Sequence, residues 1–503
     1  MTEPNSYRTI LRSSSIMGAA AVINILSGLV RMKAAAVLLG PAGVGLFGIY
    51  QNLVSTASTV SALGFGTVGT RQIADAQVNG TADDISAVRR ALFWGSLALA
   101  ALGGLLFFLL RDKIATSILA EPIRGAEVGW LALGVVLTVM AGSQTALLNG
   151  LRRIGDLARI QVASGLLGVV LGVSALLLWR ERGLLVLVLI GPLTSFVLGH
   201  WYVAKLGRIT TGPTPFRNIV GQWRVMAQLG VAFMLSALVT SLGHLAVRTL
   251  VQRELGLDEL GQFQAAWSIG MTYLTFVLGA MATDYYPRLA ACIDDKPAAC
   301  RLINQQTEIA LLLAGPVVIA MLALAPWVIQ LLYTAEFAPA VEVLRWQLLG
   351  DLFKVLSWPL GFALLAIGAG KTFIFTETTA ITIFVLGVAL GLPYIGVLAT
   401  GVSFLAMYVI YLPLVFWFAW SHLGLTWTRA VAIQAVLLVV AATIVVALGY
   451  VSDIASAAVG LGLAAVLGVY ALAKIGTMAE LSGPVGRLSA FSRRIMGKFG
   501  GGK

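Results

Sequence analysis

Charged residues are scarce in this sequence. They make up 11% of its 503 residues, whereas a soluble domain usually has about 25%. Hydrophobic residues make up 59%, and the mean hydropathy is +0.91. This composition excludes a soluble globular enzyme, a disordered chain and a collagen-like chain. Because apolar stretches recur along the whole chain, it predicts a polytopic membrane protein.

Cysteine and histidine are also rare. The two cysteines, Cys292 and Cys300, share one short polar loop, and the three histidines lie far apart in sequence. This excludes a disulfide scaffold and does not match the ligand spacing of a zinc site. We therefore predict free thiols, no metal and no cofactor.

Basic residues exceed acidic ones, and the formal net charge is +12. In a soluble protein this excess would suggest nucleic acid, but here it matches the retention of Lys and Arg in cytoplasmic loops. With the N-terminus in the cytoplasm, 23 Lys and Arg residues fall in cytoplasmic loops and seven in outer loops. We predict that both termini are cytoplasmic and that no nucleic acid is bound.

Long apolar runs predict an all-α integral membrane protein with about fourteen transmembrane helices. Each helix that crosses a bilayer needs about 20 apolar residues. The expected spans are 14–38, 43–66, 91–110, 126–149, 160–179, 184–204, 226–247, 262–287, 307–333, 343–367, 373–391, 394–420, 430–450 and 456–475.

A short pattern occurs twice, and the two copies are 216 positions apart. Leu39-Gly40, Gly45 and Phe47 match Leu255-Gly256, Gly261 and Phe263. Further on, Leu147–Gly150 resembles Leu364–Gly368. Six spans separate the copies, which predicts two six-helix lobes related as parallel repeats, with a cavity between them. The expected parts are 1–210, 211–425, and 426–503 with two extra helices and a basic tail.

The tenth span carries the densest set of polar residues. Gln347, Asp351, Lys354 and Trp358 are spaced four, three and four residues apart, so they share one helical face. Ionisable groups inside a membrane are costly and are candidates for function. The stripe either faces a cavity, or contains an Asp351–Lys354 pair that neutralises itself within the bundle.

Other charges also fall inside or at the ends of spans. Arg31 and Lys33 lie in the first span, and Arg248 lies at the corresponding place in the second copy. Asp284 and Arg288 end the eighth span, where they either serve in ion coupling or form an interfacial pair. The ionisable residues inside the predicted spans carry more positive than negative charge. This excess favours an anionic substrate such as a phosphate.

Two segments resemble a known family. They are Gly40–Phe47, continuing through Tyr50-Gln51-Asn52-Leu53 to the Gly64–Thr70 turn, and Trp346–Val355. Both are similar to the Wzx-type flippases of O-antigen and enterobacterial common antigen (lipid III). These form the polysaccharide-transporter branch of the multidrug/oligosaccharidyl-lipid/polysaccharide exporter superfamily. Many such flippases have about twelve spans, so the two extra helices are a departure.

The resemblance implies a flippase of the bacterial inner membrane, not an enzyme. It would move an undecaprenyl-pyrophosphate-linked glycan from the cytoplasmic to the periplasmic leaflet, with a polysaccharide polymerase and a chain-length regulator as the expected protein partners. The expected substrate-binding residues are Arg31, Lys33, Arg248, Gln347, Lys354 and Trp358, and Asp351 and Asp284 are the expected ion-coupling residues. Protons and the membrane potential both remain open as the driving force.

Two other functions compete with this interpretation. A multidrug or cation exporter of the same superfamily would be expected to have an acidic, aromatic cavity with fewer buried Arg and Lys residues. A membrane polysaccharide polymerase needs large outer loops for acid–base chemistry, and the longest outer loop here is about 111–125. The sequence does not identify the glycan.

Overall fold

The computed structural model describes residues 4–206 and 216–478. In these two ranges every regular element is a helix, which confirms the prediction of an all-α chain. The contacts divide the chain into two compact units, Met1–Gly261 and Gln262–Lys503. Each unit is described by itself.

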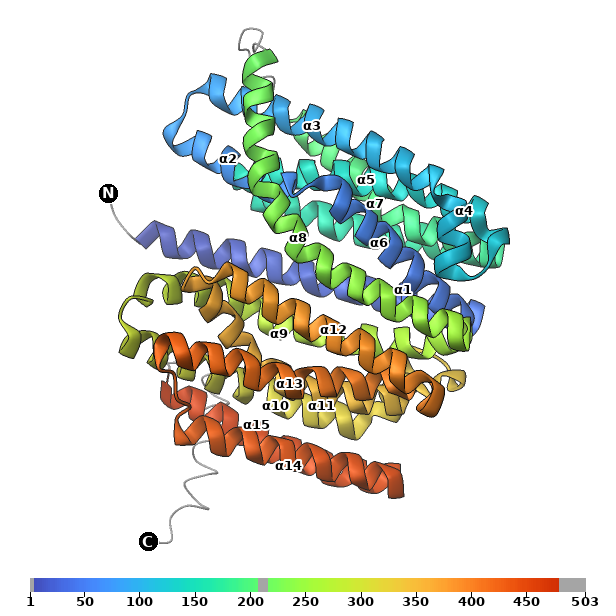
Figure 1. The fold of residues 1–503 in the computed structure, drawn as a ribbon, viewed down its shortest axis with the longest axis vertical. Helices are drawn as coiled ribbons and strands as arrows, with labels where there is room; N and C mark the ends of the chain where they lie inside the picture. Colours follow the sequence, from blue (N-terminus) through green and yellow to red (C-terminus); the bar gives the residue numbers. More distant parts are fainter. Residues whose placement is uncertain (1–3, 207–215, 479–503) are drawn as a thin grey trace. The chain divides into compact units, whose positions relative to one another are not determined.

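The first unit is built around α1, which packs against α5, α6 and α8, while α3 packs on α5 and α6 on α7 (Figure 1). Its elements are α1 (Pro4–Ala62), α2 (Phe65–Asn79), α3 (Ala82–Leu109), α4 (Arg111–Ile114), η1 (Ala115–Leu119), η2 (Pro122–Arg124), α5 (Gly125–Gly150), α6 (Ile154–Trp179), η3 (Arg180–Arg182), α7 (Gly183–Ala204), α8 (Phe216–Leu255) and the start of α9 (Leu257–Cys292).

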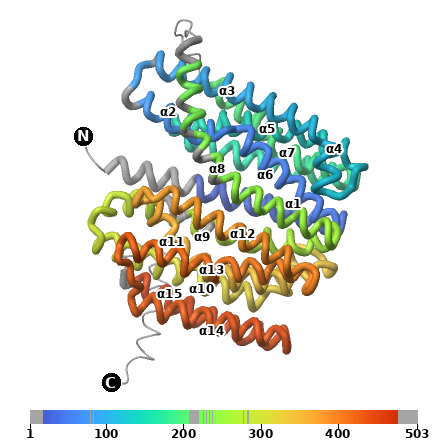
Figure 2. Tube along the Cα trace, in the orientation of Figure 1, coloured from blue at the N-terminus to red at the C-terminus, as the bar shows by residue number. Residues whose placement is uncertain are grey.

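Helix α1 consists of two helical runs that meet at Gly40. This residue has φ 66° and ψ −164°, a backbone conformation that side chains other than glycine rarely allow. Pro41 follows and begins the second run with a ring that suits the first turn of a helix. Figure 2 shows the chain reversing there. The predicted spans 14–38 and 43–66 therefore correspond to the two runs of α1.

A second glycine separates α1 from α2. Gly64 has φ 70°, and a Cβ at this position would collide with the backbone of Gly230 in α8. A Cβ at Gly230 would collide in turn with the carbonyl oxygen of Leu63. Two backbones thus meet directly at Gly64, which lies in the turn just before α2 begins at Phe65.

The two copies of the repeated pattern contact each other within the first unit. A Cβ at Gly45 would lie 2.5 Å from the carbonyl oxygen of Leu257, and a Cβ at Gly261 would collide with Pro41. Gly45 corresponds to Gly261 and Pro41 to Leu257 in the repeat. Each copy therefore touches the other through equivalent positions, as a two-fold relation between them would produce.

Helix α8 belongs to the first unit. It packs on α1, α2 and α3, and its C-terminal end is bonded to η1. The side-chain amide of Gln252 donates to the Leu119 carbonyl at 3.0 Å, and Arg253 donates to the Ser117 carbonyl at 3.2 Å. The contact boundary thus follows Gly261, whereas the predicted lobes divide at 210/211. The division into lobes stays a prediction.

In the second unit, α11 is central and contacts α10, α12, α13 and α14, while α14 and α15 both pack on α10. Its further elements are α10 (Lys296–Leu332), η4 (Ala335–Phe337), α11 (Ala340–Ala366), α12 (Gly370–Ile395), α13 (Leu398–Leu423), α14 (Arg429–Val451) and α15 (Asp453–Met478).

Ten helical stretches in the described residues are long and apolar enough to cross a membrane. One is the kinked Met17–Ala62, with 46 residues, and another is Ile154–Ala204, with 51 residues, which joins α6 and α7. Each of these two stretches contains two helical runs. Helices α8 and α9, with 40 and 36 residues, are not among these ten stretches. A polytopic membrane protein is therefore confirmed, and the count of fourteen stays a prediction.

Candidate functional site

The polar face of α11 points toward α9 in the second unit. Asp351 is fully buried, and its carboxylate accepts a hydrogen bond of 2.7 Å from the hydroxyl of Tyr273. The other carboxylate oxygen has no hydrogen-bond partner. Gly270 of α9 leaves room for both Asp351 and Gln347, because a Cβ there would contact both side chains. A buried carboxylate with only one partner is costly to keep charged.

Lys354 does not form a salt bridge with Asp351. Its Nζ contacts Met271 Sδ at 3.5 Å and lies 5.8 and 5.7 Å from the ring centres of Phe404 and Tyr408. It interacts electrostatically with both Asp351 and Glu377. The self-neutralising pair considered from sequence is therefore replaced by a three-membered group, with two carboxylates and one amine.

Glu377 of α12 is the member of this group that the sequence stripe does not include. Its carboxylate accepts a hydrogen bond of 2.6 Å from the hydroxyl of Tyr411 in α13. Tyr411 and Tyr408 are edge-to-face neighbours on the same helix. The spacing of these two tyrosines on one helical face was the available signal, but only the packing of α11, α12 and α13 brings them to Lys354.

The ends of the stripe differ from its centre. Gln347 is 2% exposed, and its side-chain nitrogen has no hydrogen-bond partner. Trp358 is half-buried and stacks on Tyr285 of α9, with 5.9 Å between ring centres, and it contacts Phe362 edge to face. Trp358 thus belongs to an aromatic group beside the ionisable cluster.

Arg31 lies in the first unit, on the first run of α1. Its guanidinium faces Gly168 of α6 and Gly191 of α7, where a Cβ would stand 3.5 and 3.7 Å from Nη1. The Nε atom is buried without a hydrogen-bond partner. Glycine on both neighbouring helices makes the space that this side chain occupies. An arginine without a bound carboxylate at such a place is suited to an anionic ligand.

The other two basic candidates of this unit lie on α1 and α8. Arg248 is 4% exposed, and its Nη1 donates to the His244 carbonyl of its own helix at 3.2 Å. Lys33 is half-buried and lies two residues from Arg31, so the two side chains leave different faces of α1.

Two charged residues that lie within the predicted spans, Asp284 and Arg345, form ion pairs. Asp284 pairs with Arg288 at 3.1 Å, and both side chains are mostly exposed. Of the alternatives for Asp284, the geometry corresponds to the interfacial pair. Arg345 pairs with Asp453 at 2.8 Å and donates to the Gly449 carbonyl, which fastens α14 and α15 to α11. Arg345 is therefore neutralised, so the cation excess inferred from sequence is smaller in the structure.

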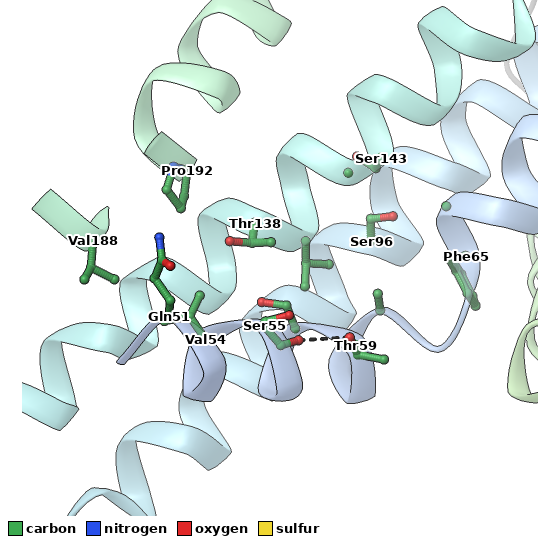
Figure 3. A pocket seen from close by; sticks show the side chains of 15 residues that line it. Gln51, Val54, Ser55, Thr59, Phe65, Ser96, Thr138, Ser143, Val188 and Pro192 are labelled. Carbon is green, nitrogen blue, oxygen red and sulfur yellow. Dashed lines mark hydrogen bonds between the residues drawn. The ribbon is translucent and has the colours of Figure 1, made fainter. Parts of the chain in front are cut away.

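The first unit also holds a cavity of about 520 Å³. Side chains from α1, α2, α3, α5 and α7 line it, and none of them is charged (Figure 3). Its polar residues are Gln51, Ser55, Ser58, Thr59, Ser96, Thr138 and Ser143. This cavity was not predicted from the sequence, because single hydroxyls on separate helices form no motif.

The second unit has a larger cavity of about 720 Å³ between α10, α14 and α15. Its lining is almost entirely aliphatic, with Gln434 and Tyr470 as the polar members. Such a cavity suits a hydrocarbon chain. Among the described residues, no group of three or more His, Cys, Asp and Glu side chains is placed to hold a metal ion.

Known proteins resemble this chain in sequence. The chain is 24% identical over 416 residues to the lipid III flippases of Escherichia coli (strain K12) and Shigella flexneri, which covers 81% of this chain and 97% of each relative. These relatives are transporters, which agrees with the prediction that the chain is not an enzyme.

Solved transporter structures share the fold. An inward closed conformation of the lipid II flippase MurJ aligns with a TM-score of 0.67 at 10% identity, over 92% of this chain and 98% of that one. An inward-facing multidrug resistance transporter of the MATE family aligns with a TM-score of 0.61 at 15% identity, over 81% and 94%. Residues 35–342 match the family of polysaccharide biosynthesis proteins. The predicted family resemblance is confirmed, and the chain belongs to this polysaccharide biosynthesis protein family.

Proposed function

We propose that this protein is a flippase for an undecaprenyl-pyrophosphate-linked oligosaccharide. It carries O-antigen or common-antigen repeat units from the cytoplasmic to the periplasmic leaflet of the inner membrane. The observation that carries the proposal is the match to 97% of the length of the lipid III flippases. A pyrophosphate and its sugars are too polar to cross hydrocarbon unaided, so a protein path is required.

The proposed transport cycle is alternating access by two lobes related as parallel repeats. The reciprocal contact of Gly45 and Gly261 with the opposite copy supports this relation. Fourteen crossings with both termini in the cytoplasm complete the proposed topology, and the distribution of Lys and Arg between loops supports this orientation. A polysaccharide polymerase and a chain-length regulator would act on the delivered units.

Arg31, Arg248 and Lys33 are the proposed pyrophosphate-binding residues. Arg31 supports this role best, because its Nε atom is buried and has no hydrogen-bond partner among the described residues. A guanidinium offers several donors to phosphate oxygens in a fixed planar arrangement. Gln347, Lys354 and Trp358 are proposed to contact the polar part of the substrate from α11.

The cavity between α10, α14 and α15 is the proposed site of the polyprenyl chain. Its aliphatic lining offers an apolar chain a surface that a polar headgroup cannot use. The two C-terminal helices supply most of this lining, which gives them a role in substrate handling. Arg345 keeps them docked on α11 through Asp453.

The group of Asp351, Lys354 and Glu377 is the proposed coupling site. All three groups are held in an environment of tyrosines and apolar side chains, where a change of one proton alters the local charge strongly. We propose that Asp351 binds and releases a proton during the cycle. An alternative driving force is the membrane potential acting on the charged substrate.

A multidrug exporter is the second candidate function. It is favoured by the MATE-like fold and by the two buried carboxylates beside tyrosines in the second unit. Arg31 argues against it, because a buried guanidinium repels an organic cation.

Conditional deletion of the gene tests the proposal in the source bacterium. Undecaprenyl-linked glycans are extracted and assigned to a leaflet by their accessibility to a membrane-impermeant reagent. The flippase predicts single repeat units retained in the cytoplasmic leaflet and loss of surface polysaccharide. Single units that reach the outer leaflet unpolymerised would point to a polymerase. Normal glycans with greater sensitivity to cationic drugs would overturn the proposal in favour of the exporter.

A further inference from the structure

The uncharged cavity in the first unit has the chemistry of a sugar-binding site. It measures about 520 Å³, which lies within the usual range for small-ligand pockets of about 300–1,000 Å³. Helices α1, α3 and α5 contribute most of its polar side chains, and in Figure 3 Ser55 and Thr59 on α1 lie opposite Thr138 on α5. Five helical elements thus converge on one partly open cavity that has polar groups in its lining.

Several of these side chains have unused hydrogen-bonding capacity. Ser58 of α1 is 6% exposed and lines the cavity, and its buried hydroxyl has no hydrogen-bond partner among the described residues. Ser96 of α3 is 2% exposed and also lines the cavity, while Gln51 and Ser55 line it from α1 with exposed side chains. A buried hydroxyl that finds no partner in the protein costs free energy unless a ligand or water supplies one.

Other hydroxyls are satisfied as donors but remain open as acceptors. Thr138 donates to the Gly134 carbonyl at 2.7 Å, Thr59 to Ser55 at 2.9 Å and Ser143 to Met140 at 2.9 Å. A hydroxyl that donates its proton keeps lone pairs for incoming donors. The cavity therefore offers both acceptors and donors to a ligand rich in hydroxyl groups.

Apolar surface lies between the polar groups. Val54, Val139, Val188, Pro192 and Phe65 complete the lining. A pyranose ring has hydroxyls at its rim and C–H groups on its faces, so it can use both kinds of surface at once. A pyrophosphate is a poor fit, since no basic side chain lines the cavity.

We propose that this cavity binds a neutral sugar unit of the transported glycan. The inference rests on the proposed flippase function for the lipid-linked nature of the ligand, but the subsite itself is defined by the chemistry of its lining. In this arrangement the charged pyrophosphate and the neutral sugars are recognised by different residues of the first unit.

Gly142 allows the cavity to be filled without disturbing the fold. It lines the space, and a Cβ built there meets no atom within 4 Å. Gly142→Leu therefore places a side chain in the cavity and removes a glycine from the interior of α5, which favours the helix. The matched control is Gly462→Leu in α15, an exposed glycine whose Cβ also meets nothing within 4 Å.

Thr138→Val removes one hydroxyl and keeps the shape of the side chain. Its control is Thr443→Val in α14, because Thr443 makes the same type of bond to the carbonyl four residues earlier, at 2.8 Å. Thr443 is exposed and lies outside the cavity. Ser96→Ala removes a buried hydroxyl from the lining of the cavity.

The first measurement compares the binding of two probes to the full-length protein in nanodiscs. They are undecaprenyl pyrophosphate and undecaprenyl-pyrophosphoryl-N-acetylglucosamine. We expect the sugar to increase affinity in the wild type. Thr138→Val and Ser96→Ala should each reduce this gain by about 2- to 10-fold, and Gly142→Leu by about 10-fold or more, with unchanged affinity for undecaprenyl pyrophosphate. The two controls should bind as the wild type does. If the sugar increases the affinity of all three variants as much as that of the wild type, the subsite is overturned.

The second measurement places a thiol in the cavity. Ser96→Cys is made in a chain with Cys292→Ser and Cys300→Ser, and its alkylation is followed with N,N′-diacetylchitobiose or with either lipid probe. Protection by the sugar-bearing lipid, but not by undecaprenyl pyrophosphate, supports the subsite. Protection by the free disaccharide alone keeps the subsite and contradicts the flippase function, provided that neither lipid binds. Alkylation at an unchanged rate with every sugar overturns the subsite.

Discussion

Helices α5 and α11 end in similar sequences, Leu147–Gly150 and Leu364–Gly368, but they carry different chemistry. Helix α5 has one ionisable residue, Glu127, in its first turn, and it presents hydroxyls to an uncharged cavity. Helix α11 has four: Glu342, Arg345, Asp351 and Lys354. Of these, Asp351 is fully buried and accepts a hydrogen bond from Tyr273. Lys354 is half-buried and interacts with Tyr408, Asp351 and Glu377.

This difference indicates that the two units have different roles. Neutral hydroxyls and the isolated Arg31 suit the binding of a ligand, because they offer hydrogen bonds and charge without a competing partner. The carboxylates and amine around α11 already engage one another and their tyrosines, so they suit the uptake and release of a proton. Single substitutions in each unit separate these two roles, and the largest expected effect is on transport.

Asp351→Asn should abolish transport that is driven by a proton gradient. The amide keeps the size of the carboxylate and can still accept from Tyr273, but it cannot exchange a proton. Binding of undecaprenyl pyrophosphate should stay within about twofold of the wild type, because the change lies outside the proposed binding residues of the first unit. Proteoliposomes with an imposed pH gradient measure the transport rate. The exposed Asp112→Asn is the control. Wild-type transport by Asp351→Asn would refute the coupling role.

Arg31→Ala should weaken the binding of undecaprenyl pyrophosphate by about 10- to 100-fold, the value of a charge-assisted hydrogen bond. Arg31→Lys should recover part of the affinity, because it restores the charge without the planar guanidinium. Titration in nanodiscs measures both variants. Arg159→Ala, at an exposed pair with Asp156, should bind normally. Equal affinities for Arg31→Ala and the wild type would remove Arg31 from the proposed pyrophosphate-binding residues.

Arg345→Ala should lower the free energy of unfolding by about 3 kcal/mol, the low end of the range for breaking a buried ion pair, because Asp453 is half-exposed. Thermal unfolding of the purified protein measures the loss. Arg111→Ala, at an exposed pair, is the control and should change stability little. Should Arg345→Ala be as stable as the wild type, the pair would not anchor α14 and α15.

Asp284→Asn should have the smallest effect. It breaks an exposed pair with Arg288, which contributes less than about 1 kcal/mol. Transport and unfolding should both match the wild type in the same two assays. A loss of gradient-driven transport comparable to that of Asp351→Asn would instead return Asp284 to the coupling site.

How much of the site could be predicted depends on how far apart in the sequence the interacting residues lie. The stripe on α11 was visible from sequence, because residues four, three and four apart share a face of any helix. Glu377, Tyr273 and Tyr411 join Asp351 and Lys354 through three further helices, and no spacing along the chain encodes that meeting. The pairing of Arg345 with Asp453 joins residues 108 positions apart and was missed for the same reason.

The sequence by itself determined the helical membrane class, the positions of most helices and the repeated glycine pattern. Apolar run length and helical periodicity are local properties, and a bilayer leaves few other ways to satisfy the backbone. Only the tertiary structure decided that Gly45 and Gly261 each contact the opposite copy of the repeated pattern, and that hydroxyls from separate helices line one cavity. Such contacts depend on how whole helices pack, and each residue contributes to them without a signature of its own.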